Sequence, residues 1–341
     1  VMTMGLLTGC GGSSDSKKTT GDSGDKTISV GFSQVGAESD WRTANTESMK
    51  STFSEENGYS LQFDDAQQKQ ENQIKAIRSF IEQDVKYIVL APVTETGWDT
   101  VLKEAKDAGV PVIIVDRMVK VSDDSLYTAW VGSNFELEGK KACAWLKAYC
   151  DAKKIDKLNI VDIQGTIGAS AQIGRTAGLE AAVEANGWKL LAAQSGEFTQ
   201  AKGQEVMESM IKQYGKDINV VYRENDNEAF GAIDALQAAG YTVGSDIANG
   251  EVMVLSFDTT RTGLQNVLDG KITMDTECNP LHGPRVEEIV KSLEKGETPD
   301  KQQYVDEGIF AHDDTVKSIE VDGETYEVTV VTQEVIDGRA Y

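Results

Sequence analysis

Short apolar runs of strand length alternate with segments of helical spacing through most of this chain. The strand-like runs are 28–32, 87–90, 112–115, 158–163, 220–222 and 252–257. Between them apolar residues recur at helical intervals, as Ile74, Ile77 and Ile81 do. Because the runs are apolar throughout rather than in alternation, they predict parallel strands that helices cover on both faces.

These strand–helix units fit poorly into one sheet and comfortably into two. The chain after its first 26 residues is also about two ordinary domains long. We therefore expect the fold class α/β, with two doubly wound parallel-sheet lobes rather than a single domain. Near the end of the chain, Asp322-Gly323 separates two apolar alternations and predicts a β-hairpin.

The first residues read as the start of a secreted lipoprotein. Leu7-Thr8-Gly9-Cys10 is followed by a polar run of Gly, Ser, Asp, Lys and Thr. The segment 1–6 is too short to cross a bilayer and resembles the remnant of a signal peptide. We expect Cys10 to carry lipid, which would anchor an extracytoplasmic protein to the cell membrane. The alternative is a free cysteine in a disordered leader.

Composition excludes several classes of function. The formal net charge is −23, and so acidic a surface repels phosphate backbones, so nucleic acid is not an expected partner. Cys143 and Cys150 are too far apart on one predicted helix for a disulfide. No Cys/His cluster suits zinc, no phosphate-binding glycine motif occurs, and His282 and His312 are the only histidines. We expect no metal, no cofactor and no catalysis.

Polar side chains gather after the expected strands, at the edge where parallel sheets bind ligands. The candidate ligand-binding residues are Glu38, Ser39, Asp40, Trp41, Arg42, Asp116, Arg117, Arg175, Phe198, Asn225, Asp258, Glu277 and Asn279. Carboxylates, guanidiniums and carboxamides can each engage two hydroxyl groups. The ring of Trp41 or Phe198 can cover an apolar sugar face. Together these residue types predict a polyhydroxylated ligand.

Each candidate alone has a second interpretation. Glu38 and Arg42 are spaced as a helix-surface ion pair. Asn225 could cap the helix that follows it. Trp41 could belong to the core, and Arg175 to a solvated helix face. The alternatives stay open residue by residue, and only the combination favours a binding site.

Several longer stretches resemble a known family. They include 30–36, 38–42, 67–76, 96–98, 101–108, 164–166, 194–196 and 205–209. They are similar to the periplasmic sugar-binding proteins of ABC importers in the ribose/galactose branch, and within it to galactofuranose-binding members. The resemblance runs from about residue 27 to 310 and implies a type I periplasmic-binding-protein fold. The tail after Phe310 departs from the pattern.

The resemblance also implies a ligand set and partners. It transfers sugar contacts to Asp116, Arg117, Arg175, Asn225 and Asp258, and maps the segment 38–42 onto the site. Phe198 falls where ribose binders place a stacking aromatic ring. Around Cys278 the ribose-type glutamine is absent, which leaves Glu277 and Asn279 as alternatives. The implied partners are a monosaccharide and a membrane ABC permease.

We therefore expect a monomeric, hinge-bending, lipid-anchored monosaccharide receptor of an ABC importer. Its expected lobes are 27–131 with 279–308, and 132–278 with 309–341, joined by hinge strands and preceded by a tether at 1–26. A receptor that feeds a sensor kinase or chemoreceptor, and a sugar-processing enzyme, are the alternatives. The effector domain of a transcription regulator would need a helix-turn-helix before Ile28, where the sequence has Gly, Ser, Lys and Asp instead.

Overall fold

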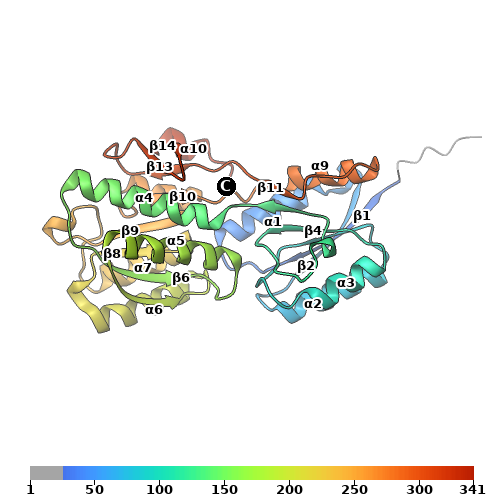
Figure 1. Ribbon diagram of the computed structural model, residues 1–341, viewed down its shortest axis with the longest axis horizontal. Helices are drawn as coiled ribbons and strands as arrows, with labels where there is room; N and C mark the ends of the chain where they lie inside the picture. Colours follow the sequence, from blue (N-terminus) through green and yellow to red (C-terminus); the bar gives the residue numbers. More distant parts are fainter. Residues whose placement is uncertain (1–25) are drawn as a thin grey trace, which may run out of the picture.

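The computed structural model describes residues 26–341, which form two sheets with helices packed on both (Figure 1). One sheet has six strands in the order β11-β5-β4-β3-β1-β2, and the other has eight in the order β13-β14-β12-β10-β9-β8-β6-β7. The predicted lipid site Cys10 lies outside the described residues. Within 26–341, no helix combines the length and apolar character needed to cross a membrane.

The first lobe is built on the six-stranded sheet. Its elements are β1 (Ile28–Gln34), α1 (Asp40–Thr52), β2 (Tyr59–Asp65), α2 (Gln70–Glu82), β3 (Tyr87–Leu90), α3 (Asp99–Asp107), β4 (Val112–Asp116), β5 (Ala129–Gly132), α9 (Gly283–Glu294) and β11 (Gln302–Tyr304). All strand pairs in this sheet are parallel.

The second lobe is built on the eight-stranded sheet. Its elements are α4 (Phe135–Lys153), β6 (Asn159–Gln164), α5 (Ser170–Asn186), β7 (Lys189–Ser195), α6 (Gln200–Tyr214), β8 (Val220–Arg223), α7 (Asp226–Ala238), β9 (Met253–Asp258), α8 (Arg261–Leu268), β10 (Met274–Glu277), β12 (Ile309–Ala311), β13 (Ser318–Val321), β14 (Glu324–Val330) and α10 (Gln333–Asp337). Here β12 runs antiparallel to β10, and β13 runs antiparallel to β14. The α/β class and its two mainly parallel sheets are confirmed.

The continuous apolar runs have a direct structural cause. On β4, Ile113 and Val115 belong to one core cluster, whereas Val112 and Ile114 belong to another. Successive side chains of a strand point to opposite faces, so each face of the sheet has its own core beneath helices. The strand β9 divides its residues between two clusters in the same way.

Local signals in the sequence end the elements where expected. Helix α3 is followed by Gly109, whose φ of 74° is the left-handed conformation that suits glycine. Asp322 and Gly323, with φ of 51° and 85°, form the tight turn between β13 and β14. Cys143 and Cys150 are both free on α4, as their spacing predicts.

The chain passes between the sheets at three places. It crosses after β5, after β10 and again between β11 and β12. The first crossing leads into α4, the second into α9 of the first lobe, and the third back to the second lobe. The carboxyl ends of β4, β9 and β10 supply residues to one shared cavity, so the two sheets present their carboxyl edges to each other.

Candidate ligand-binding site

A cavity of about 270 Å³ lies between the lobes. Its lining residues are Glu38, Ser39, Trp41, Arg42, Asp116, Arg117, Ala171, Arg175, Phe198, Asn225, Asp258 and Cys278. Most of the residues singled out in the sequence are therefore brought together. The lining residues come from both lobes, so a molecule held in the cavity would contact both.

Arg42 is held between two carboxylates of the first lobe. Its Nε donates to Glu38 at 2.9 Å and its Nη2 to Asp116 at 2.8 Å. Glu38 precedes the N-cap residue Ser39 of α1, so this pair is not the exposed helix pair that the spacing alone allows. Both side chains of the pair are only 2% exposed, which makes it part of the cavity wall.

Arg117 is the second cation of this lobe, and it lies farther from the carboxylates than Arg42 does. Its Nη2 lies 3.7 Å from Glu38, and its Nη1 donates to the Val93 carbonyl at 2.8 Å. Burial and the charge of Arg42 lower the pKa of Arg117 to about 10, so it remains charged at neutral pH. Its guanidinium lies 5.1 Å from the ring centroid of Phe198, which is supplied by the other lobe.

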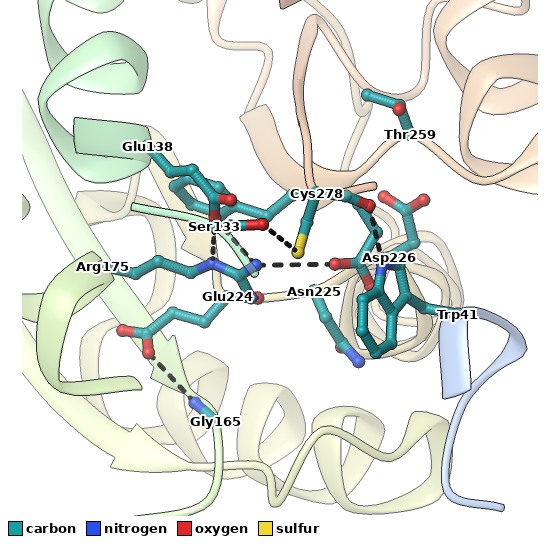
Figure 2. Close-up of polar contacts among 12 residues, drawn as sticks. Trp41, Ser133, Glu138, Gly165, Arg175, Glu224, Asn225, Asp226, Thr259 and Cys278 are labelled. Carbon is teal, nitrogen blue, oxygen red and sulfur yellow. Dashed lines mark hydrogen bonds and ion pairs between the residues drawn. The ribbon is translucent and has the colours of Figure 1, made fainter. Parts of the chain in front are cut away.

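Arg175 is the corresponding cation of the second lobe (Figure 2). Its Nε and Nη2 each lie 2.9 Å from Glu138, and its Nη1 donates to the Glu224 carbonyl at 2.6 Å. Asp258 lies 3.7 Å from Nη2. Burial raises the pKa of Asp258 well above its usual range, while Arg175 acts in the opposite direction. These contacts fix the guanidinium before any ligand enters.

Asn225 is both a helix cap and a lining residue. Its Oδ1 accepts from the Glu228 amide at 2.9 Å, which caps α7, and its Nδ2 donates to the Phe198 carbonyl at 2.9 Å. A carboxamide NH₂ has two protons, so one donor remains for a ligand. The two interpretations of Asn225 are thus compatible.

Two aromatic rings and a glycine shape the cavity. Phe198 is buried in contact with Gly165, where an added Cβ would come within 1.9 Å of the ring. The Trp41 indole donates to the Cys278 carbonyl at 2.6 Å, which links α1 to the crossing after β10 (Figure 2). Both rings can therefore cover an apolar face of a bound ring.

Three of the residues that line the cavity have strained backbone conformations. Asp116, Phe198 and Asp258 all have positive φ, at 64°, 60° and 114°. Non-glycine residues in such conformations cost on the order of 1–3 kcal/mol each and persist where neighbouring contacts enforce them. We infer that the surrounding contacts enforce these conformations and so hold the three side chains at the cavity.

Three candidates from the sequence do not line the cavity. The side chain of Asp40 is exposed on α1, and only its amide is engaged, by Asn227 across the lobes. Glu277 points instead to Arg339, at 2.8 Å. Asn279 lies on the second crossing, where its amide donates to Glu307. Cys278, which lies between Glu277 and Asn279 just after the end of β10, lines the cavity instead.

The sequence reasoning missed Ala171, Cys278 and the partner of Arg175, Glu138. Glu138 is 1% exposed on α4. The one signal in the sequence is an acidic residue at a buried position of a helix, which would need a cation as its partner. Ala171 carries no chemical signal. Cys278 enters the sequence analysis only as the position around which the ribose-type glutamine is absent.

One group of side chains has the spacing of metal ligands. Ligand atoms of Glu138, Cys278 and Glu307 lie within 4.8 Å of one another, beside the cavity. Glu138 already pairs with Arg175, and Glu307 accepts from Ser133 at 3.0 Å and from the Asn279 amide at 2.8 Å. Burial raises the pKa of both carboxyls. Arg175 and these donors engage one oxygen of each carboxyl, and Oε2 of Glu138 has no hydrogen-bond partner.

Guanidiniums and carboxyl groups line the cavity in equal numbers. Three guanidiniums face three carboxylates, those of Glu38, Asp116 and Asp258. A site with paired charges offers strong hydrogen bonds in both directions without net attraction for an anion or a cation. The arrangement suits a neutral ligand with many hydroxyl groups.

The rims of the two lobes touch around the cavity. The Asp40 amide donates to Asn227 at 3.0 Å, the Met118 amide to Ser170 at 2.8 Å, and the Glu95 amide to the Gly168 carbonyl at 3.0 Å. These bonds join segments of different lobes, so the described conformation is a closed one.

Comparisons with known proteins agree with this geometry. A model of the periplasmic binding protein domain matches residues 30–280. The galactofuranose-binding protein YtfQ of Escherichia coli is 42% identical over 297 residues, which cover 86% of this chain and 91% of that protein.

Two solved structures are similar over most of their length. One, from Mycobacterium smegmatis in complex with β-D-fucofuranose, has 40% identity and a TM-score of 0.78, covering 84% of this chain and 92% of that one. The other is the binding protein of the arabinose ABC transporter of Shewanella, bound to α- and β-L-arabinofuranose. It has 40% identity and a TM-score of 0.78, covering 84% of this chain and 93% of that one.

Proposed function

The chain belongs to the periplasmic-binding-protein family, and on this basis we propose that it is an extracytoplasmic monosaccharide receptor that delivers its ligand to a membrane ABC permease. The observation that carries the proposal is the cavity between the lobes, with balanced planar polar groups on both sides. Guanidinium and carboxylate groups each take two hydroxyls in their own plane.

Binding proceeds in two steps in this proposal. The sugar meets one lobe first, and closure about the crossing segments brings the polar groups of the other lobe onto it. Ligand shifts the open–closed equilibrium only by its greater affinity for the closed state. The hydrogen bonds between the rims favour that state but do not depend on the sugar.

We propose galactofuranose or a similar aldose in its furanose form as the ligand. YtfQ is named for galactofuranose, and the two structures at 40% identity are complexes with a fucofuranose and an arabinofuranose. What these names share is the five-membered ring. A compact cavity with a ring on two sides, Trp41 and Phe198, is consistent with that shape.

A ligand screen tests the function. Purified protein is heated with a panel of aldoses, fructose, amino acids and short peptides, and co-purified ligand is identified by mass spectrometry. We expect stabilisation by one or a few neutral sugars and no turnover of them. Stabilisation by an amino acid or peptide alone would contradict the carbohydrate assignment, and conversion of the sugar would favour an enzyme.

We further propose a lipid anchor on Cys10 and a monomeric state. The proposal of the anchor rests on the sequence around Cys10. Mass spectrometry of the N-terminal peptide from the native membrane fraction should show a diacylglyceryl-modified cysteine, and Cys10→Ser should release the protein into the soluble fraction. Sedimentation that gives a dimer would contradict the monomer.

A further inference from the structure

The segment after α10 returns to the region between the lobes. Figure 1 places the C label there, beside the strand ends rather than at the outer edge of the second lobe. This segment, 338–341, lies in the tail whose sequence departs from the sugar-binding pattern. Its two long side chains, Arg339 and Tyr341, contact the back of the cavity wall.

Arg339 binds the turn that follows β9. Its Nη2 donates to the Thr259 carbonyl at 2.9 Å and to Thr259 Oγ1 at 2.6 Å. Its Nη1 pairs with Glu277 at 2.8 Å, and both of these side chains are about nine-tenths buried. The guanidinium therefore joins the ends of two neighbouring strands, β9 and β10.

Tyr341 lies against the same wall. Its hydroxyl accepts from Arg339 Nη2 and lies 3.3 Å from the Asp258 carbonyl and 3.4 Å from the Cys278 carbonyl. Its ring packs on the apolar cluster that includes Trp41 and Phe198, which line the cavity. The Cys278 carbonyl that Tyr341 approaches is also the acceptor of the Trp41 indole (Figure 2).

The backbone that these two side chains hold is strained. Asp258 and Thr259 have φ of 114° and 56°, and neither is glycine. Such conformations persist only where surrounding contacts enforce them. Arg339 and Tyr341 engage the carbonyls of both residues, so they supply part of that enforcement. Asp258 in turn presents its carboxylate to the cavity beside Arg175.

We propose that Arg339 and Tyr341 are positioning residues of the ligand site, which hold Asp258 and Cys278 in their binding orientation from outside the cavity. The proposal deepens the function proposed above and rests on it for the nature of the ligand. It also assigns a role to the tail: the hairpin and α10 carry these two side chains back to the site. Neither residue lines the cavity.

Tyr341→Phe tests the proposal with little risk to folding, because it removes one hydroxyl and keeps the ring. We expect calorimetric affinity for D-galactose or L-arabinose to fall by about 3- to 10-fold, as for one lost hydrogen bond. The control is Tyr326→Phe on the inner, partly buried face of the hairpin, where Lys141 lies 4.4 Å over the ring and which lies outside the cavity lining. The control should keep affinity, and both variants should keep their melting temperature.

A measurement that needs no sugar separates this proposal from the proposed function. In the unliganded protein, Tyr341→Ala should accelerate hydrogen exchange in peptides that cover 257–262, while peptides of the first lobe stay unchanged. Wild-type protein that binds neither sugar would count against the proposed function alone. Unchanged exchange at 257–262, or wild-type affinity in Tyr341→Phe when the wild type binds, would overturn the positioning role.

Discussion

At the scale of single residues, the site depends on guanidinium groups that buried carboxylates hold in place. Arg42 and Arg175 each donate to a buried carboxylate at 2.8–2.9 Å, and so lose little freedom when a ligand arrives. A preorganised guanidinium binds more tightly because its ordering precedes binding. Removing one leaves buried acceptors without a partner.

Arg175→Ala should weaken sugar binding by roughly 10- to 100-fold, which corresponds to the about 1.5–3 kcal/mol of a charged hydrogen bond. The variant removes the donor that faces both Glu138 and Asp258. Calorimetry with the sugar selected by the screen measures the effect. Arg285→Ala on the half-exposed face of α9 is the matched control and should bind normally. Equal affinities of the two variants would remove Arg175 from the site.

Glu224 should make stability depend on pH. Burial raises the pKa of Glu224 to about 7, despite hydrogen bonds from Thr176 and the Gly165 amide that act the other way. The folded state then holds a proton that the unfolded chain, with a pKa of about 4.3, releases earlier. This contribution is complete below about pH 4.3 and is lost as the pH rises through about 7, so the free energy of unfolding should decrease across that window.

Urea unfolding at several pH values measures how the free energy of unfolding depends on pH. Glu224→Gln should make the decrease smaller, because the amide does not titrate, while other buried carboxyls with a raised pKa, such as Asp258, keep the remainder. Glu208→Gln on the exposed face of α6 should leave the pH dependence unchanged. An identical pH dependence in Glu224→Gln and the wild type would show that another group is responsible.

The sequence predicted which types of residue form the site, but not the direction in which each side chain points. It found the cations and carboxylates because they follow strand ends, and ten-residue segments such as 33–42 carry that signal in one stretch. It placed Glu277 and Asn279 at the site and overlooked Cys278, because the alternation of side chains depends on where β10 ends. Glu138 was missed because a helix period does not distinguish a buried glutamate from an exposed one.

At the scale of elements, the loops after the strands set the cavity. The loop after β6 brings Gly165 against the ring of Phe198, and the turn after β9 bends at Asp258. The inner strands were predictable because both of their faces are buried, as in β4 and β9. The outer strands β2 and β7 are largely half-exposed, and their sequences mix polar residues with apolar ones.

Gly165→Ala should displace the ring of Phe198, because the new Cβ would lie 1.9 Å from it. We expect sugar affinity to fall at least tenfold, by about 1.4 kcal/mol or more, since the ring covers one side of the ligand. Gly187→Ala is the control: it strains the end of α5 at a φ of 65°, away from the cavity. That variant should lose stability but keep affinity. Loss of stability without loss of affinity in Gly165→Ala would contradict the role of the ring.

At the scale of the whole molecule, two lobes with the same strand order face each other across three crossings. The order of β1 to β5 in the first sheet is repeated by β6 to β10 in the second. Each lobe therefore presents the carboxyl edge of its sheet, which is where open α/β sheets bind ligands. Sequence could predict two lobes from the repetition, but not that their rims touch in this conformation.

Rim contacts should favour the closed state. Asn227→Ala combined with Ser170→Ala removes two hydrogen bonds that join the lobes, to the amides of Asp40 and Met118. We expect affinity to fall by about 3- to 30-fold, because the closed state becomes less populated. Small-angle scattering of the unliganded variant should show a larger radius of gyration than the wild type. An unchanged radius with unchanged affinity would mean that closure does not involve these bonds.

The central claim is that one neutral sugar ring is enclosed between the lobes and is held by both. A crystal structure of the protein with the sugar identified by the screen tests it most directly. We predict density for a single ring in the cavity, with Arg42 or Asp116 on one side and Arg175 or Asp258 on the other within hydrogen-bonding distance. A sugar bound outside this cavity, or held by one lobe alone in the closed protein, would contradict the account.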